Sequence, residues 1–466
     1  MPWRGLPLKI VPGAHLRGPK RKRAAPLPPR ARSFFGWGSC GRVVKLRSIT
    51  TDEFAGHDED TSYRALLRVR GFTQLLVSTL AARIATQMFS VLLVLFVLET
   101  HHSASLSGIV VVCSQVPGII VSPIAGALLD RGSRVALMRL DYLVGSTCIT
   151  TIGILSVLHS LPTGVLLLVV STASVTAPLS RVGGRSLYPV LVPRPLWDRS
   201  NAADSGTNVV ATVLGPGVAG VLVALVGPRV ALFVPAIVLL LAAVLLVRFV
   251  VPDAPSAAAA SVLADARGAI GYVWRNRVLR MLAGTMTVFN ACGGILTVAV
   301  PFIVLRGLHG GSATVGLLFA IMGAAGFLAG LLTGRFGTES REQHLLATSC
   351  MTTAVAFGAL AFDRHELVLV ILVAVIGTAN GPLTVAMFSL RQRATEPQWF
   401  GRAFAVSMNL NFVGSPVGAA IAGALLTRSV KLTLLVAASC AVIGGIWPTV
   451  LPASSYEPLA QGAAAS

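Results

Sequence analysis

Long apolar stretches fill most of the chain from Phe72 onward, and they limit the possible folds more than any other feature. Each stretch is close to or above the roughly 20 residues that a helix needs to cross a bilayer. Lipid offers the backbone no hydrogen-bond partners, and the stretches lack the alternating pattern of a barrel strand, so we expect helices. The sequence predicts twelve spans, at 73–98, 104–128, 135–158, 161–183, 203–226, 229–251, 281–305, 311–335, 344–363, 366–390, 402–426 and 431–452.

The overall composition excludes a soluble fold for a chain of 466 residues. Hydrophobic residues make up 54% and charged residues only 12%, whereas soluble domains carry roughly 25% charged residues. So few charges cannot cover a globule with a well-solvated surface, and so many apolar residues are not typical of a disordered chain. We therefore expect an all-α membrane protein with twelve transmembrane helices.

Motifs for metal, cofactor or ATP chemistry are missing from the sequence. The six cysteines are scattered singly, and there is no CxxC, no HExxH and no P-loop. Nor do acids, histidines and nucleophiles in the spans form a set with the spacing of an active site. The sequence therefore predicts neither an enzyme nor a metal or cofactor site, and it disfavours transport powered by ATP on this chain.

Positive charge is distributed unevenly between the two sides of the predicted helices. Past residue 70, seventeen arginines fall in segments on the side of the termini, Arg181 and Arg391 among them, and only five lysines and arginines fall on the opposite side. Cytoplasmic loops carry such an excess, so we expect both termini in the cytoplasm. This bias explains the net charge of +20 without a nucleic-acid partner.

Two polar regions divide the chain. The N-terminal region is rich in Lys, Arg, Pro and Gly, which is typical of disorder; alternatively, residues 1–62 do not belong to the mature protein. In the Ala-rich linker between the halves, Tyr272 and Trp274 indicate an amphipathic helix at the membrane surface. The expected domains are a disordered basic tail (1–65), a six-helix half (66–251), a cytoplasmic linker (252–280), a second six-helix half (281–452) and a polar tail (453–466).

The two predicted halves resemble each other in sequence. Gly126 to Arg131 ends the second span, and Gly330 to Arg335 ends the eighth with related residues, at an offset of 204 positions. The same offset relates Pro178 in the fourth span to Pro382 in the tenth. Repeated six-helix halves with breaks at matching places are typical of secondary transporters, whose binding site lies between the repeats.

The loop after the second span carries a family resemblance. It reads GALLDRGSR, from Gly126 to Arg134, and resembles the G-x-L-x-D-R-x-G-R loop of the major facilitator superfamily. The chain departs from that pattern at Ser133, and its second copy has lost the acid. The matching positions are Gly126, Leu128, Asp130, Arg131 and Arg134.

The fifth span adds a second resemblance. Gly206, eight further residues and then Gly215, Pro216 and Gly220 resemble the antiporter motif of the same superfamily, which is associated with exporters. These small residues would let the span bend and approach the Gly-rich eighth span closely. The preceding stretch, RSLYPVLVPRPLWDRSNAADS, resembles macrolide-efflux and siderophore-exporter members.

The resemblance covers about residues 65–452 and implies a function. It implies a monomeric transporter in the cytoplasmic membrane that exports drugs or small metabolites by alternating access, coupled to protons. It also implies that Asp130 packs near Gly401–Phe404 and latches one state of the cycle; the alternative is a charged turn that only sets orientation. A uniporter or importer with the same fold, and a non-transporting receptor or assembly protein, remain alternative functions.

A few polar residues inside the spans are candidates for a substrate cavity. Arg83 lies about ten residues into the first span, and Gln87 shares its helical face. They could bind an anionic or carbonyl group, or Arg83 could pair with carbonyls of a neighbouring helix. Asn290 in the seventh span and Asn380 in the tenth fall on helices that line the cavity in the resembled family. Hydrogen bonding between helices is the alternative for both.

Acidic residues are scarce in the predicted spans. Asp141 lies one to two turns into the third span and is the candidate for a proton site or an ion pair with an arginine on the cytoplasmic side. Glu99 and Asp204 fall at span edges, where we expect solvated side chains. No acid is placed at mid-membrane depth, so a facilitator that needs no proton is consistent with the same sequence.

Overall fold

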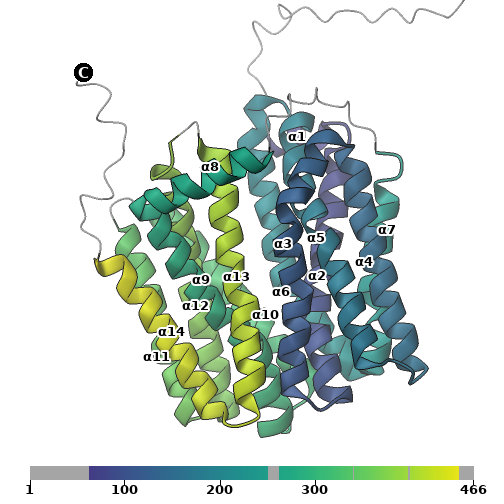
Figure 1. Cartoon of the computed structure of the whole chain (residues 1–466), viewed down its shortest axis with the longest axis vertical. Helices are drawn as coiled ribbons and strands as arrows, with labels where there is room; N and C mark the ends of the chain where they lie inside the picture. Colours follow the sequence, from purple (N-terminus) through teal and green to yellow (C-terminus); the bar gives the residue numbers. More distant parts are fainter. Residues whose placement is uncertain (1–61, 250–261, 339–340, 397–398, 451–466) are drawn as a thin grey trace, which may run out of the picture. The chain divides into compact units, whose positions relative to one another are not determined.

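The computed structural model describes residues 62–249, 262–338, 341–396 and 399–450. Secondary structure within these residues is entirely helical. The C-terminal tail and all but the last residues of the expected basic tail lie outside the described residues. Figure 1 shows the helices, coloured along the sequence.

The first half begins with a short helix, α1, before the long ones. A brief 3-10 turn, Arg194–Leu196, precedes α6. The helices are α1 (Tyr63–Arg68), α2 (Phe72–Thr100), α3 (Ala104–Arg131), α4 (Arg134–Val157), α5 (Thr163–Leu191), α6 (Trp197–Ala231) and α7 (Phe233–Leu245).

The second half is preceded by a helix of the linker, α8, and repeats the succession of long helices. A π-helical turn, Ile303–Gly307, extends α9. The helices are α8 (Val262–Arg275), α9 (Arg277–Phe302), α10 (Ser312–Phe336), α11 (Glu342–Phe362), α12 (Glu366–Arg393), α13 (Phe400–Leu426) and α14 (Val430–Val450).

Eleven helices of the described residues are long and apolar enough to cross a membrane. The twelfth predicted span is divided between two helices, because α6 runs through a kink at Gly227. Gly227 has φ +77°, a left-handed conformation that glycine adopts without strain, and Pro228 follows it as a helix-starting residue. The last turn of α6 together with α7 therefore forms the sixth span, so the expected all-α fold of twelve transmembrane helices is confirmed.

Local capping fixes where several helices begin. The Ser103 hydroxyl accepts a hydrogen bond from the Leu106 amide at the start of α3, and Ser133 does the same for Ala136 at the start of α4. Asn276 accepts hydrogen bonds from the amides of Val278 and Leu279 and starts α9. Such caps satisfy amides that have no partner inside the helix.

The helices of the two halves pack in the same pattern. In the first half α2 packs on α6 and α7, and α5 packs on α3 and α4; in the second half α9 packs on α13 and α14, and α12 packs on α10 and α11. The two main contacts between the halves are also related, since α6 packs on α10 and α3 on α13. The repeat seen in the sequence is therefore a repeat in packing, and the halves are pseudo-symmetric.

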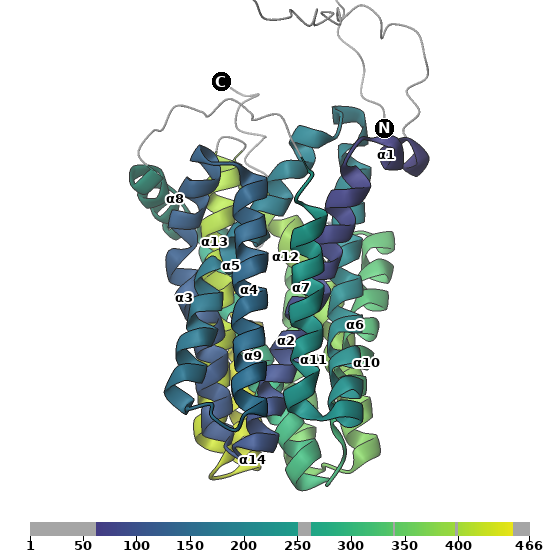
Figure 2. The ribbon, with the colours of Figure 1, turned by 90° about the vertical axis from the view of Figure 1, so that its right-hand side faces the viewer.

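Glycines bring the halves together at one end of the long helices. We call this end, which carries the α2–α3 and α9–α10 connections, the far end, and the end that carries α1 and α8 the α8 end (Figures 1 and 2). A β-carbon on Gly108 of α3 would lie 3.0 Å from the Cα of Gly423 of α13. A β-carbon on Gly220 of α6 would lie 2.7 Å from the Cα of Gly316 of α10. The two seams between the halves therefore have equivalent glycine contacts.

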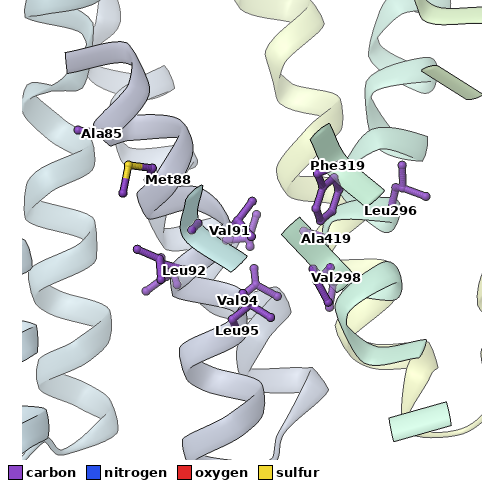
Figure 3. Close-up of a cluster of buried hydrophobic side chains, with 14 of the residues drawn as sticks. Ala85, Met88, Val91, Leu92, Val94, Leu95, Leu296, Val298, Phe319 and Ala419 are labelled. Atoms are coloured by element: carbon purple, nitrogen blue, oxygen red, sulfur yellow. The ribbon is translucent and has the colours of Figure 1, made fainter. Parts of the chain in front are cut away.

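A buried apolar cluster fills the space next to these seams. Figure 3 shows Val94 and Leu95 of α2 on one side and Val298 of α9 on the other, all almost fully buried. Ser105 of α3 donates a hydrogen bond to the Gly423 carbonyl at 3.0 Å, which joins the halves at the same end. Apolar contacts and helix-to-helix hydrogen bonds therefore close the far end of the interface.

Helix α8 is the amphipathic linker helix that Tyr272 and Trp274 indicated. The Tyr272 ring stacks on Trp399 at 5.1 Å between centroids, and the Tyr272 hydroxyl accepts a hydrogen bond from the Glu396 amide. Trp274 is 64% exposed on the other side. The linker before residue 262 lies outside the described residues.

Candidate functional site

The loop motif spans the junction of α3 and α4. Gly126 lies in α3, and Arg134 begins α4 and donates a hydrogen bond to the Ser186 carbonyl of α5 at 3.1 Å. The motif therefore ties the α8 ends of α4 and α5 together. The side chains of Asp130 and Arg131, and those of Gly401–Phe404, lie outside the described side chains, so the expected contact between them stays a prediction.

The antiporter-like motif lies along α6 and contacts two helices. A β-carbon on Gly215 would lie 2.5 Å from the Gln87 β-carbon of α2, and Gly220 meets Gly316 of α10. Gly206 has no such neighbour within 4 Å. Pro216 lies inside α6, and the kink of that helix is at Gly227 instead. The contact of Gly220 with the eighth span follows the expectation, and its partner there is Gly316.

Other glycines of the eighth span have different partners. Gly323 of α10 faces Thr212 and Val213 of α6, whereas Gly326 and Gly330 pack on Gly377 and Gly381 of α12. The Gly-rich face of α10 is therefore shared between the seam with the first half and packing inside the second half. Small residues permit such close approach of helices inside a membrane.

Asp204 is not the solvated end that its position in the predicted spans suggested. Because α6 begins at Trp197, Asp204 lies two turns inside the helix and its side chain is 10% exposed. It forms an ion pair with Arg83 of α2 at 2.8 Å, and Arg185 of α5 approaches it to 3.8 Å. One carboxylate thus joins three helices of the first half.

Arg83 is held by this carboxylate and by α6 itself. Its guanidinium donates hydrogen bonds to the Asp204 carbonyl, at 2.7 Å, and to the Thr207 hydroxyl. Gln87 donates to the Thr212 hydroxyl of the same helix at 3.4 Å. Both side chains thus have partners on α6, which fits the alternative in which Arg83 pairs with a neighbouring helix.

Asp141 is buried in α4 and meets polar groups from α5. It is 9% exposed, the side chains of Ser180 and Thr176 lie beside it, and it interacts with the charge of Arg181. The arginine beside it is therefore on the next helix, not the neighbouring Arg139. A carboxylate in such a place can either stay ionised beside the arginine or take up a proton.

Arg181 connects Asp141 with the other half of the protein. Its guanidinium carbon lies 5.6 Å from the centroid of the Phe412 ring on α13, within the range of a cation–π interaction. The side chain is nevertheless exposed, although it lies ten residues before the end of α5. Arg181 therefore contacts the second half from within the length of α5. Arg181 lies near the end of the predicted fourth span, 161–183, and was counted with the arginines on the side of the termini, whereas α5 continues to Leu191 and places it deeper in the helix.

The two asparagines of the second half differ in environment. Asn290 of α9 is half-buried and donates a hydrogen bond to the Asn411 carbonyl of α13 at 3.1 Å. Asn380 of α12 is exposed, and its carbonyl accepts from Thr384. Within the described residues, no hydrogen bond joins any two of Arg83, Gln87, Asn290 and Asn380.

Two charged residues at the α8 end of the second half were not among the predicted site residues. Arg391 was counted among the loop arginines, but it is fully buried in α12 and donates to the Met408 sulfur at 2.7 Å. Glu342, at the start of α11, is buried and pairs with Arg393 at 3.1 Å. Arg391 directly follows the predicted end of the tenth span at 390 and so looked like a loop residue, whereas α12 continues to Arg393.

Twelve spans, two halves with one packing pattern and charged groups between their helices define a polytopic membrane transporter. Comparisons with known proteins agree with this class. A family model described as Major Facilitator Superfamily matches residues 75–419. The chain belongs to the Major Facilitator Superfamily.

Two relatives and one solved structure are similar to this chain. An uncharacterized MFS-type transporter, y4rN, of Sinorhizobium fredii is 34% identical over 85% of this chain and 98% of its own length. The multidrug efflux pump Tap of Mycolicibacterium fortuitum is 23% identical over 71% of this chain and 82% of its own. A bacterial homolog of the human lysosomal transporter Spinster, in an inward-facing and occupied conformation, has the same fold with a TM-score of 0.67 at 13% identity, covering 84% of this chain and 97% of that one.

Proposed function

We propose that the chain exports amphiphilic drugs or small metabolites across the cytoplasmic membrane in exchange for protons. The observation that carries this proposal is the buried Asp141 beside Arg181, which itself contacts Phe412 in the other half. A proton acceptor is thus linked to the surface between the halves. The similarity to pumps named for multidrug efflux supports the direction and the substrate class.

The orientation follows from the charge bias of the loops. With the α8 end in the cytoplasm, both termini lie there, as the positive-inside rule predicts. The glycine seams and the apolar cluster then close the external side, and the exposed Arg181 is reached from the cytoplasm. We therefore assign this conformation to the inward-facing state of an alternating-access cycle.

In the proposed cycle, the protonation state of Asp141 determines which group Arg181 interacts with. When Asp141 is ionised, its charge holds Arg181 in the first half. A proton that enters from outside neutralises Asp141, Arg181 then interacts with Phe412, and the substrate leaves to the outside. Release of the proton to the cytoplasm restores the charge on Asp141, and the next substrate can then bind from the cytoplasm.

The remaining candidates take separate parts in this proposal. Asn380 and Asn290 would face the substrate from the second half, while Gln87 would border the space from α2. Arg83 would keep α2, α5 and α6 together as one body through Asp204. Gly126, Asp130, Arg131 and Arg134 would latch the cytoplasmic side, and Gly206, Gly215, Pro216 and Gly220 would allow α6 to move along α2 and α10.

The test is proton movement in proteoliposomes that contain the purified monomeric protein and a trapped pH-sensitive dye. Amphiphilic compounds are added one by one across an imposed pH gradient. We expect compound-dependent proton flux in the wild type and none in Asp141→Asn. Exchange of labelled compound without a gradient should persist in that variant, because exchange needs no net proton movement. Asp363→Asn, an exposed acid at the far end, is the matched control.

Each alternative function gives a different result in this assay. Transport that moves compound without any proton, in wild type and variant alike, would identify a uniporter. Net uptake driven by an inward proton gradient would identify an importer. No transport and no binding of any compound would favour a receptor or assembly protein. Proton flux that persists in Asp141→Asn would show that Asp141 is not the site of proton coupling.

A further inference from the structure

A cavity of about 590 Å³ lies at the far end of the second half, away from the space between the halves. Its walls come from the end of α9 with the π-helical turn, from the α11–α12 connection and from the first residue of α14. Phe302, Ile303 and Phe362 line it together with Arg306, Arg364 and His365. Apolar and cationic side chains thus share one opening near the membrane surface.

The two arginines of this cavity have no counter-ion among the residues that the structure describes. Within the described residues, neither Arg306 nor Arg364 forms an ion pair or a side-chain hydrogen bond, and both are exposed. Asp363 also lines the cavity, but one of its oxygens accepts a hydrogen bond from the His365 amide at 3.0 Å. Glu366 is the other acid nearby and is exposed on α12. The arginines are therefore available to an anionic ligand.

The apolar wall of the cavity faces outward. Phe362 is 70% exposed at the end of α11, and the Lys431 ammonium of α14 lies 4.2 Å from the centroid of its ring. A lysine over an exposed aromatic ring places a third cation beside the apolar surface. Such a surface suits a molecule with an anionic head and an apolar tail.

The concentration of cations here is not explained by orientation of the chain. Four of the five lysines and arginines on this side belong to the second half, namely Arg306, Arg364, Arg428 and Lys431. The fifth, Arg229 of the first half, has a partner in His159. Positive residues on this side oppose the bias that orients membrane helices, so a separate role in binding is indicated.

We infer that this cavity binds the headgroup of an anionic phospholipid from the leaflet at the far end. The phosphate would lie between Arg306 and Arg364, and an acyl chain would run along Phe362. Basic pockets between membrane helices bind anionic headgroups because each cation near the surface attracts the negative lipid. This inference depends on the membrane fold alone and does not require the proposed proton coupling.

The test measures lipids bound to the purified full-length protein by native mass spectrometry. The protein is titrated with phosphatidylglycerol or phosphatidylcholine, and Arg306→Gln/Arg364→Gln is compared with the wild type. We expect phosphatidylglycerol to bind more tightly than phosphatidylcholine, and phosphatidylglycerol binding to fall about 25-fold in the double variant, about fivefold for each cation removed. Arg229→Gln, a cation at the same end of the first half, should bind as the wild type does.

Two further measurements separate the possible sources of the anion. Glycerol phosphate and inorganic phosphate are titrated against thermal unfolding of the same protein. If they raise the melting temperature as much as phosphatidylglycerol, the ligand is a free anion and the lipid assignment is overturned. Equal binding of both lipids, or unchanged phosphatidylglycerol binding in a double variant that elutes as a single folded species, overturns it as well.

Discussion

Gly220 of α6 and Gly316 of α10 touch through their backbones, since a β-carbon on Gly220 would lie 2.7 Å from the Cα of Gly316. Gly108 and Gly423 make the equivalent contact between α3 and α13. Contacts this close leave no room for a side chain and depend on the absence of one. They make the two seams the part of the interface between the halves that is most sensitive to added volume.

Gly220→Ala should therefore destabilise the protein. The new methyl group would meet the Ser312 carbonyl oxygen at 2.5 Å, and relief of that clash costs about 1–3 kcal/mol by the precedent of overpacked cores. The measurement is the melting temperature of the purified protein in detergent, which should fall by several degrees. Gly293→Ala in α9, which has no neighbour within 4 Å, should leave it unchanged or raise it. Equal melting temperatures for both variants would show that the seam can open without cost.

Asp204→Asn should destabilise the first half by about 2 kcal/mol, because Arg83 would lose its counter-ion between α2 and α6. The effect is set below the roughly 3–5 kcal/mol of a fully buried pair because Arg83 is 21% exposed. Thermal unfolding of the variant measures it. The double variant Arg83→Gln/Asp204→Asn removes both charges and should recover part of the loss. A double variant less stable than either single one would mean that the pair is not the main interaction.

Phe412→Leu should slow export by about fivefold, since it removes a cation–π contact worth about 1 kcal/mol and keeps an apolar side chain of similar size. Phe412→Tyr retains the ring and should stay close to the wild type. Initial rates of compound export from proteoliposomes, at equal amounts of reconstituted protein, provide the comparison. Leucine and tyrosine variants with the same rate would show that Arg181 does not act through this ring.

Asp130→Asn should impair transport while expression stays near that of the wild type, because the loop motif is proposed to act in the cycle and not in folding. Export rates and the yield of folded protein are measured together. Asp363→Asn serves as the control, since it removes one exposed carboxylate outside the motif. Unaltered transport in Asp130→Asn would show that the loop is only a charged turn that sets the orientation of the chain.

The spans were predictable because hydropathy depends on the average of many residues. The break between the predicted fifth and sixth spans, 203–226 and 229–251, coincides with the kink at Gly227. The ends were less accurate wherever charged or small residues continue a helix. The predicted fourth span stopped at 183, whereas α5 continues to Leu191 and carries Arg185 on its last turns.

The charged contacts could not be predicted for a related reason. Asp204 looks like a span edge in the sequence, and only its neighbours on α2 and α5 make it an interior carboxylate. Arg83 and Asp204 are more than a hundred positions apart in the sequence, so no local pattern reveals their contact. The same holds for Arg391, which is buried and donates to the sulfur of Met408 on another helix. Sequence identified the residue types inside the membrane, and the tertiary structure decides which of them meet.

The stacking of Tyr272 on Trp399 has a consequence for dividing the protein into two chains. With the hydrogen bond from Glu396 and the buried Val273 and Leu279, this contact makes α8 part of the second half. A gene split for separate expression of the halves should therefore be cut before residue 262, so that the second fragment keeps α8. A cut after Arg275 would leave α8 on the wrong fragment and expose the aromatic surface that it covers.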